Sequence, residues 1–563
     1  MKMTGAEIIV NTLIEQGVTD VFGYPGGQVL NIYDALYKYS DRIHHVLTAH
    51  EQGASHAADG YSRATGKVGV CIATSGPGAT NLVTGIATAM LDSIPMVAIT
   101  GNVPCALIGK DSFQEIDITG ITLPITKHNY FINNIADLAD AIREAFQIAK
   151  SGRPGPVLID VPKDVQCAEY DYEVHPAAEK TPLPKATDEE IARAVQMIAA
   201  AKRPYLYIGG GAAGLGMGDA IRRFADKIGA YIGCTFMGLS AIPNSEPRFL
   251  GMQGMHGHYA SSMAQKEADL IIGIGVRFSD RATGNVAKYA RGSKIIQLDP
   301  DFAEINKNVP VDIGIIADIN DAFHRIAEAT EAASRPDWQA LVEGLKADEQ
   351  RYEAEAAAAS QAALPPKAVF DIINEKKPAG TIIATDVGQH QMWAAQYADF
   401  DRTRRFVSSG GLGTMGFGLG AAIGAYTATK DTTVLITGDG SFGMNLNELA
   451  TAVSYQIPVI IVLMNNGVLG MVRQWQTLFY GKRYSNTVLG RQTDFVKLAE
   501  AFGAIGYRAA DRAQFAEAFE KALGAGRPVV IDTIIGQDEF VLPMLPPGGS
   551  IDDIIVKKEE TEG

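Results

Sequence analysis

The chain has 563 residues, of which 47% are apolar, and its formal net charge is −15 at pH 7. This length is too great for one hydrophobic core and predicts about three domains. The acidic balance, without a clustered stripe of lysine and arginine, argues against nucleic acid as a substrate or partner. The apolar run 457–464 falls far short of the roughly 18 residues that a membrane-spanning helix needs, so we expect no membrane contact.

Four cysteines lie in apolar or small-residue contexts, without the CxxC spacing of a zinc site: Cys71, Cys105, Cys167 and Cys234. We expect buried free thiols in a reducing compartment rather than disulfides or zinc ligands. The first residues, MKMTGAEIIVNTLIEQG, fit an amphipathic helix capped near Thr4. They have neither the apolar core of a signal peptide nor the basic pattern of a transit peptide, so we expect a cytoplasmic protein.

Three segments of the chain repeat a pattern of short apolar strands that end in glycine or polar residues. The first segment contains VGVCIATSGPG, IPMVAITGN and GPVLIDVPKD; the second contains PYLYIGGGA, DLIIGIGVRF and KIIQLDPD; the third contains GTIIATDVG, TTVLITGDG, PVIIVLMNN and RPVVIDTII. Continuous Val, Ile and Leu are typical of strands with helices on both faces. We predict an α/β protein with three doubly wound parallel-sheet domains.

Two linkers separate these segments. Residues 175–187 are rich in Pro, Lys and Glu, and residues 329–367 are Ala/Glu-rich, helical in composition and close with LPP. We therefore expect domains at residues 1–172, 188–330 and 365–545, followed by a C-terminal tail at 546–563.

The third domain contains two successive strands that end in oxygen-bearing side chains. The strand 434–437 runs into Gly438-Asp439-Gly440, and the next strand, 459–464, runs into Asn465-Asn466. A right-handed crossover makes these strands parallel neighbours, so Asp439 and Asn466 meet at one edge of the sheet. The glycines allow close approach of phosphate, and the following helix N-terminus favours an anion. One carboxylate and one amide oxygen suit Mg²⁺, which completes its coordination shell with phosphate oxygens and water.

The GDG segment also has a simpler interpretation, which is a tight turn between strand and helix that binds nothing. The asparagine pair after the next strand favours the metal site. GDG followed by NN after one strand–helix–strand unit resembles the thiamine-diphosphate motif. That resemblance implies thiamine diphosphate and Mg²⁺ as cofactors.

The same resemblance implies a catalytic glutamate in the first domain. HEQGASHAADGY (50–61) follows the strand-like segment 45–48, and Glu51 has the position and small-residue surroundings that the family shows. The family's role for Glu51 is a hydrogen bond to N1′ of the cofactor's pyrimidine, which favours the 4′-imino form that removes the C2 proton. Without the resemblance, Glu51 is a first-turn acid stabilised by the helix dipole. Related glyoxylate carboligases replace this glutamate, so its presence favours the ordinary activation route.

The resemblance covers nearly the whole chain and is closest to the large, catalytic subunit of biosynthetic acetohydroxyacid synthase (acetolactate synthase). The segments that carry it are FGYPGG (22–27), HEQGASHAADGYSRATG (50–66), SGPGATN (75–81), GVRFSDR (275–281), GQHQMW (388–393), GGLGTMGFG (410–418), GDGSF (438–442) and NNGVLGMVRQWQ (465–476). The family implies a thiamine-diphosphate-binding fold with a central FAD-associated domain. Its reaction decarboxylates pyruvate and ligates the two-carbon unit to pyruvate or 2-ketobutyrate. The products are 2-acetolactate and 2-aceto-2-hydroxybutyrate, in valine, leucine and isoleucine biosynthesis.

The resemblance implies roles for matching residues. Those for the diphosphate and aminopyrimidine are Val387, Gly388, Gln389, His390, Gly413, Met415, Gly438, Gly440 and Ser441. Met415 would be wedged under the cofactor so that the cofactor bends, and Val468 would give its backbone carbonyl to Mg²⁺. The substrate pocket would contain Gly27, Gln28, Phe113, Gln114, Lys163 and Met471, with Gln114 and Lys163 taking part in catalysis. The chain differs in length from the family around Gln28.

Two residues would select the substrates. By the family's RFxDR pattern, Arg281 would offer its planar fork to a keto-acid carboxylate. Trp475 would form a wall that favours 2-ketobutyrate over pyruvate as the second substrate. The alternatives are a surface ion pair of Arg281 with Asp280 or Asp301, and a packing role for Trp475 on a helix.

The middle domain has a glycine-rich turn, 209–214, that fits GxGxxG after a strand. A dinucleotide-binding unit should also place an acid at the end of its second strand, but the strand 231–236 ends in Thr-Phe-Met, which disfavours NAD. The resemblance implies FAD held without a redox role. The matching residues are Arg153, Gly210, Gly211, Met255, His256, Arg277, Asp299 and Asp318.

Three other functions stay open at this point: a flavin-dependent pyruvate oxidase of the same fold, a catabolic acetolactate synthase without FAD, and a catalytically inactive nucleotide-binding or scaffold subunit. The resemblance implies a homodimer or homotetramer, because Glu51 and Asp439 lie in different domains and the family completes its site from two subunits. It also implies a separate small regulatory subunit.

Overall fold

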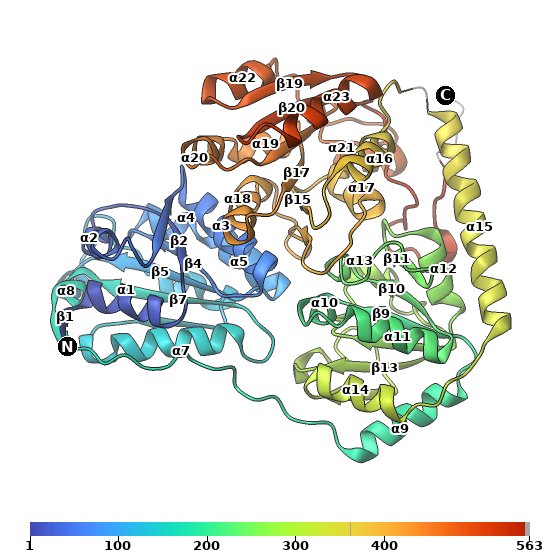
Figure 1. Ribbon diagram of the computed structural model, residues 1–563, viewed down its shortest axis with the longest axis horizontal. Helices are drawn as coiled ribbons and strands as arrows, with labels where there is room; N and C mark the ends of the chain where they lie inside the picture. The colour runs from blue at the N-terminus through green and yellow to red at the C-terminus, as the bar shows by residue number, and fades with distance from the viewer. Residues whose placement is uncertain (361, 558–563) are drawn as a thin grey trace.

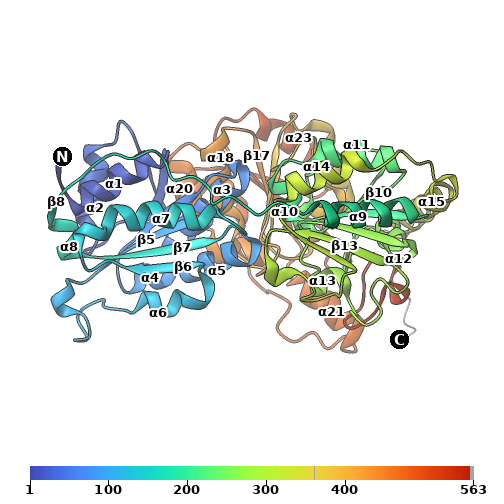
Figure 2. The ribbon, with the colours of Figure 1, turned by 90° about the horizontal axis from the view of Figure 1, so that it is seen from below.

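The computed structural model describes residues 1–360 and 362–557. This part of the chain forms three parallel six-stranded sheets, each flanked by helices, in three domains arranged as a triangle (Figure 1). Figure 2 shows the N-terminal and central domains side by side, with the C-terminal domain behind them. The predicted fold class is therefore confirmed.

The N-terminal sheet has the strand order β3-β2-β4-β5-β7-β6. Its strands are β2 (Asp20–Tyr24), β3 (His44–Leu47), β4 (Gly69–Ala73), β5 (Met96–Asn102), β6 (His128–Phe131) and β7 (Pro156–Pro162). Its helices are α1 (Gly5–Glu15), α2 (Leu30–Lys38), α3 (Glu51–Thr65), α4 (Pro77–Asn81), α5 (Val83–Asp92), α6 (Ile118–Thr122), α7 (Leu138–Lys150) and α8 (Lys163–Cys167). A short antiparallel pair, β1 (Lys2–Thr4) and β8 (Glu169–Asp171), joins the two ends of the domain. Thr4 caps α1, as the sequence predicted, and it forms a capping box with Glu7.

The central sheet has the order β11-β10-β9-β12-β13-β14. Its strands are β9 (Pro204–Ile208), β10 (Tyr231–Cys234), β11 (Phe249–Met252), β12 (Leu270–Ile274), β13 (Lys294–Asp299) and β14 (Ile313–Ile316). Its helices are α9 (Asp188–Ala200), α10 (Gly210–Gly214), α11 (Gly218–Ile228), α12 (Tyr259–Glu267), α13 (Asp280–Thr283) and α14 (Ile319–Ala329). Strand β9 is buried over its whole length, which explains its continuous apolar sequence.

The C-terminal sheet has the order β16-β15-β17-β18-β20-β19. Its strands are β15 (Ile382–Thr385), β16 (Phe406–Val407), β17 (Thr433–Gly438), β18 (Ile460–Asn465), β19 (Ile505–Ala509) and β20 (Val529–Ile534). Its helices are α16 (Pro366–Lys376), α17 (Gln389–Tyr397), α18 (Gly418–Thr429), α19 (Asp439–Asn445), α20 (Glu448–Ser454), α21 (Gly470–Phe479), α22 (Phe495–Phe502) and α23 (Arg512–Leu523). The two strands predicted before GDG and NN are β17 and β18, each within one residue of its expected bounds.

The predicted linkers differ in form. Residues 175–187 have no helix or strand and cross from the N-terminal domain to α9, whereas the Ala/Glu-rich linker contains the long helix α15 (Pro336–Ala359) (Figure 1). Residue 361 of this linker and residues 558–563 of the predicted tail lie outside the described residues.

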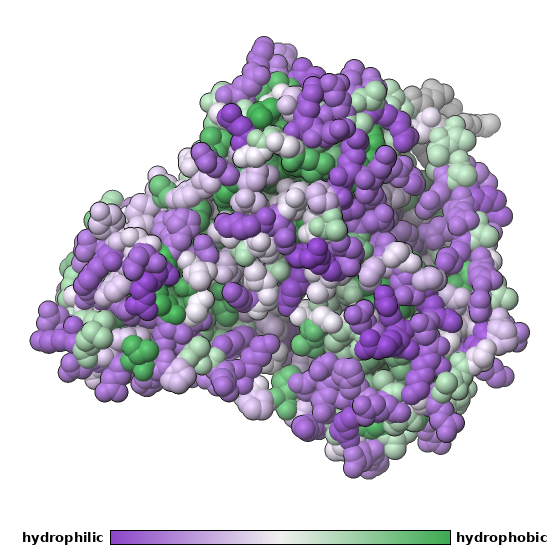
Figure 3. Space-filling view, in the orientation of Figure 1, coloured by the Kyte–Doolittle hydropathy of each residue, from purple (hydrophilic) through white to green (hydrophobic). Residues whose placement is uncertain are grey.

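The polarity of the surface and the burial of the cysteines can also be compared with the expectations from the sequence. The face shown in Figure 3 is mostly hydrophilic, in keeping with the acidic composition. None of the described helices is long and apolar enough to cross a membrane. All four cysteines are free, as expected. Cys71 and Cys234 are buried, but Cys105 is only half-buried and Cys167, where α8 ends, is exposed, so the expectation of buried thiols is wrong for these two.

Helix α3 of the N-terminal domain packs lengthwise on α18 of the C-terminal domain. Glycines make this possible: a Cβ at Gly424 would overlap the carbonyl oxygen of Ala57, and a Cβ at Gly60 would overlap that of Ala421. Gly53 lies in the same way against the carboxylate of Glu448. The two helix backbones therefore touch, which fixes the N-terminal domain on the C-terminal one.

Gly424→Ala tests this contact. We expect a lower melting temperature, because the new methyl group meets a backbone carbonyl that cannot move aside; overpacking of this kind costs about 1–3 kcal/mol. Gly344→Ala is the control, since Gly344 is exposed inside α15 with nothing within 4 Å of its would-be Cβ. In that helix the same change should be neutral or stabilise by up to about 1 kcal/mol. Equal effects of the two changes on thermal unfolding would contradict the close packing.

Candidate functional site

Three loops leave the carboxyl edge of the C-terminal sheet side by side. Strand β17 pairs in parallel with β15 on one side and with β18 on the other, and its last residue, Gly438, lies opposite Met464. The loops after β15, β17 and β18 therefore start at Asp386, Asp439 and Asn466. Figure 1 shows β15 and β17 side by side below α19. The predicted convergence of Asp439 and Asn466 is present in the structure.

Asp439 and Asn466 lie close together at this edge. The backbone N–H of Asn466 favours the charged form of the Asp439 carboxylate, but burial outweighs this effect and raises the pKa of that carboxyl to about 6. The side-chain oxygen of Asn466 accepts the N–H of Val468 at 3.1 Å. The described residues contain no cluster of three or more His, Cys, Asp or Glu that could hold a metal by themselves. A site with one carboxylate and one amide suits Mg²⁺ that takes its other ligands from a diphosphate and water.

The predicted diphosphate residues surround this pair. Gln389 donates to Gln474 Oε1 at 3.0 Å and to the carbonyl of Glu539 at 2.7 Å, while its own Oε1 lies 3.4 Å from Asn466 Nδ2. Ser441 Oγ donates to the carbonyl of Val387 at 2.8 Å, which ties the first loop to the second. Hydrogen bonds between polar side chains and backbone groups thus link the loops at this edge of the sheet.

His390, among these residues at the edge of the sheet, has a ring nitrogen without a hydrogen-bond partner in the described chain. Its ring is buried, which lowers its pKa to about 3, and its Nε2 has no hydrogen-bond partner among the described residues. The ring packs on Gly438, whose would-be Cβ would lie 2.9 Å from His390 Nδ1. Gly388 also borders this ring. A buried nitrogen without a partner fits a site that a polar ligand completes.

The loop that carries Gly413 and Met415 lies beside the GDG turn. Gly413 has φ +70°, a conformation that favours glycine, and the Met415 methyl group lies 3.8 Å from the would-be Cβ of Gly440. Asp386, which the sequence analysis missed, accepts the N–H groups of Gly416 at 2.8 Å and Gly418 at 3.1 Å. The only sequence signal for it is an aspartate at the end of an apolar strand.

The N-terminal domain gathers a second group. Glu51 is the first residue of α3, after the cap residue His50, and its Oε2 accepts Asn81 Nδ2 at 2.9 Å. Lys163 donates to the carbonyl of Gly27 at 3.1 Å. The buried side-chain oxygen of Gln28 has no hydrogen-bond partner in the described chain, which again fits a pocket for a polar ligand.

Other predicted pocket residues of this domain are less enclosed. Gln114 has φ +61° and packs on Gly76, and Phe113 is 83% exposed. Among the described residues, no hydrogen bond or ion pair joins Glu51, Gln28, Gln114 or Lys163 to Asp439, Asn466 or Trp475. We refer to these two groups, one in each terminal domain and without a polar contact between them, as two half-sites.

Arg281 and Trp475 have the contacts that the simpler interpretations predicted. Arg281 is exposed and lies 3.7 Å from Asp280, a pairing that contributes little energy in solvent and leaves the guanidinium able to bind a carboxylate. Trp475 packs edge-on against Phe479 on α21, one turn after Met471. Neither contact conflicts with a role in substrate selection.

The residues predicted for FAD follow the carboxyl ends of the central strands β9, β11, β12, β13 and β14, except Arg153. Met255 and His256 follow β11; burial lowers the pKa of His256 to about 4, and its Nδ1 has no partner among the described residues. Arg277 follows β12 and is exposed; Asp299 ends β13, and burial raises its pKa to about 6. The shared edge and the free nitrogen fit a long polar ligand.

Four of these residues also have structural roles. A Cβ at Gly211 would lie 2.8 Å from Gly275 Cα, and Gly210 packs on Met237, so close packing alone explains this pair of glycines. Asp318 caps α14. Arg153 bridges two domains, with Ser93 Oγ at 2.7 Å and Glu304 Oε1 at 2.6 Å.

Comparison with known proteins identifies relatives over the full chain. Three family models match: the N-terminal TPP binding domain of thiamine pyrophosphate enzymes at residues 3–121, the central domain at 191–326 and the C-terminal TPP binding domain at 386–533. The chain is 46% identical to the acetolactate synthase large subunit of Corynebacterium glutamicum, over 98% of this chain and 90% of that protein. It is 44% identical to the isozyme 2 large subunit of Escherichia coli acetolactate synthase, over 99% and 100% of the two chains. With the isozyme 3 large subunit the identity is 42%, over 99% of each chain.

The neighbouring asparagines offer a matched test of the metal site. Asn466→Ala should raise the Mg²⁺ concentration needed for half-maximal binding of thiamine diphosphate by about tenfold or more, because it removes an oxygen ligand. Asn465 instead donates to Asp532 at 2.8 Å, so Asn465→Ala should lower stability and leave the Mg²⁺ requirement unchanged. Titrations followed by tryptophan fluorescence measure both. The assignment fails if the two variants need the same amount of Mg²⁺.

Proposed function

Because the chain belongs to the thiamine pyrophosphate enzymes, within the family of acetolactate synthase large subunits, we infer that it catalyses acetolactate synthesis. The reaction decarboxylates one pyruvate and joins its two-carbon unit to a second 2-keto acid, pyruvate or 2-ketobutyrate. It is the first common step of branched-chain amino acid biosynthesis. The structural observation that carries this proposal is the placement of Asp439 and Asn466 directly after the paired ends of the parallel strands β17 and β18.

Most of the predicted site residues would hold Mg²⁺ and thiamine diphosphate, and one of them would transfer a proton. Bound thiamine diphosphate supplies the electron sink for decarboxylation and ligation. Asp439 and Asn466, with the backbone of Val468, would hold Mg²⁺, and neutral His390 and Gln389 would contact the diphosphate. Met415 would support the aminopyrimidine, and Glu51 would exchange a proton with that ring.

The substrates meet residues from several domains. Arg281 would bind the carboxylate of a keto acid through its planar fork. Gln28, Gln114 and Lys163 would line the pocket on the N-terminal side, together with Gly27 and Phe113. Trp475 and Met471, on one face of α21, would shape the space for the side chain of the second keto acid.

We also propose FAD in the central domain as a structural cofactor, supported by the shared strand edge and by His256. A pyruvate oxidase of the same fold should show net flavin reduction with pyruvate, and a catabolic acetolactate synthase should purify without flavin. We expect a yellow protein that forms acetolactate without net flavin reduction. An inactive scaffold subunit is disfavoured because Glu51, Asp439 and Asn466 are all present.

For assembly, we propose a homodimer or homotetramer with a separate small regulatory subunit. The separation of the two half-sites supports more than one copy, and the names of the relatives as large subunits support a smaller partner. Four free thiols suit a reducing compartment, so we place the protein in the cytoplasm.

Glu51→Gln tests the proton-transfer role. Acetolactate formation with thiamine diphosphate, Mg²⁺ and FAD supplied should fall by about 10²–10⁴-fold, because a positioned acid is lost while the side-chain shape is kept. Glu7→Gln is the control, since Glu7 is also a first-turn acid but serves the cap of α1. That variant should keep its turnover. Activity of Glu51→Gln within a few-fold of wild type would remove Glu51 from the assigned role.

Trp475→Leu tests substrate selection. In a competition between pyruvate and 2-ketobutyrate as second substrate, we expect the preference for 2-ketobutyrate to fall more than total turnover, since the aromatic wall is lost. Tyr480→Leu, an exposed ring at the end of the same helix, should leave the product ratio unchanged. An unaltered ratio for Trp475→Leu would contradict the assignment.

A further inference from the structure

A buried ion cluster joins the N-terminal domain to the loop that carries Met415. Arg63, near the end of α3, bonds to both carboxylate oxygens of Asp59 and, at 2.9 Å, to Asp92 at the end of α5. The side chains of Arg63, Asp59 and Asp92 are 4%, 0% and 1% exposed. Charges this far from water are held only by well-placed partners. The cluster therefore has one preferred geometry.

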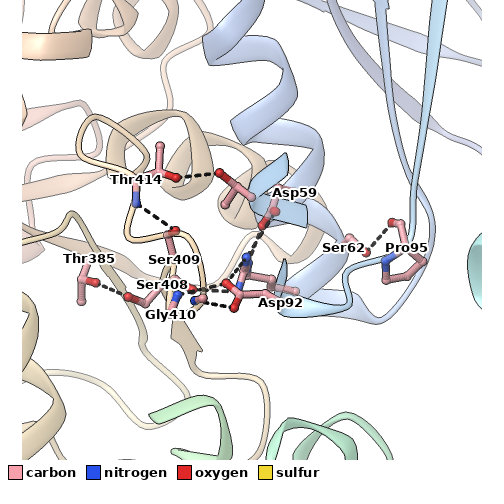
Figure 4. A network of polar contacts seen from close by, with 12 residues as sticks. Asp59, Ser62, Asp92, Pro95, Thr385, Ser408, Ser409, Gly410 and Thr414 are labelled. Carbon is pink, nitrogen blue, oxygen red and sulfur yellow. Dashed lines mark hydrogen bonds and ion pairs between the residues drawn. The ribbon is translucent and has the colours of Figure 1, made fainter. Parts of the chain in front are cut away.

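The cluster reaches across the domain boundary to main-chain groups of the loop 408–418. Arg63 Nη1 donates to the carbonyl of Ser408 at 2.7 Å. The Asp92 carboxylate accepts the N–H of Gly410 at 3.0 Å and of Gly411 at 2.7 Å. Figure 4 shows Asp92 facing Gly410 and Ser408, with Asp59 on the adjoining helix. Each oxygen of Asp92 thus has a loop N–H, and one of them has the guanidinium as well.

The rest of the loop is fixed by four further hydrogen bonds. The N–H of Thr414 donates to Ser409 Oγ at 3.1 Å, and Thr414 Oγ1 lies 2.7 Å from Thr88 Oγ1 on α5 (Figure 4). Beyond Met415, Asp386 accepts the N–H groups of Gly416 and Gly418. The loop is consequently held by a carboxylate at each end, one from the N-terminal domain and one from its own domain.

We propose that Arg63 and Asp92 are positioning residues for the cofactor's aminopyrimidine ring. They act through the loop 408–415: by fixing Ser408, Gly410 and Gly411, they set where Gly413 and Met415 lie. The proposal rests on the proposed function, because it assigns the loop to thiamine diphosphate. It predicts that the N-terminal domain controls the position of the cofactor's ring through its contacts with this loop.

The test separates the ring end of the cofactor from its diphosphate end. Inorganic pyrophosphate with Mg²⁺ uses only the site of Asp439 and Asn466, whereas thiamine diphosphate also needs the loop. Asp92→Asn keeps the side-chain shape and leaves Arg63 paired with Asp59, but replaces a charged acceptor by an amide that donates on one side. It should weaken the binding of thiamine diphosphate to the full-length protein about tenfold and leave pyrophosphate binding unchanged. Calorimetry measures both ligands.

Two further variants complete the design. Arg63→Lys keeps the charge but loses the fork, and should show the same selective loss. Thr88→Val removes the hydrogen bond to Thr414 and leaves the ion cluster intact. If the other variants do not fold, this variant still shows whether a loosened loop selectively weakens the binding of thiamine diphosphate. The control is Arg143→Lys, which alters another ion pair of the N-terminal domain, with Glu15 at 2.9 Å, and should lower melting temperature without changing either affinity.

The outcomes distinguish this proposal from the function itself. A selective loss of thiamine diphosphate affinity in the loop variants supports it. Equal losses for both ligands, or a lower melting temperature with both affinities intact, would overturn it. Wild-type protein that binds pyrophosphate but not thiamine diphosphate would instead overturn the proposed function.

Discussion

The parallel pairing of β15, β17 and β18 is the constraint on which the rest of the structure depends. Parallel strands send their carboxyl ends to one edge, so three loops that are far apart in sequence leave the sheet together. Each loop begins with an oxygen-bearing residue: Asp386, Asp439 or Asn466. The strands are buried on both faces, so their register cannot shift without exposing apolar surface. A metal and a diphosphate can then be recognised by short side chains that have almost no freedom.

Much of this arrangement could be predicted from the sequence. The strand patterns gave the α/β class, and the positions of Asp439 and Asn466 after two successive strands predicted that the two residues lie close together, because both facts follow from local patterns and one crossover rule. The glycines of the middle domain were harder to interpret. Gly211 is explained by close packing on Gly275, a contact between distant residues that no local pattern reveals.

The residues that the sequence analysis missed share a physical property. Asp386, Asp92 and Glu448 are buried carboxylates that each accept hydrogen bonds from main-chain N–H groups, such as that of Ala49 for Glu448 at 3.1 Å. Because a main-chain donor exists at nearly every residue, the sequence around it carries no sign of the bond. These acids hold loops through such bonds, and they can be recognised only when the partner segment has been placed in space. The residues that matched family motifs were found because their own sequence neighbourhoods are unusual.

The glycine contacts between α3 and α18 have a mechanical consequence. Two helices whose backbones touch cannot slide along each other, since a displacement of one residue would drive a side chain into a carbonyl oxygen. They cannot rotate apart without breaking the buried contacts along both of their lengths. This contact therefore couples the N-terminal and C-terminal domains of one chain. A hinge motion between these two domains would have to break the backbone contacts of α3 with α18.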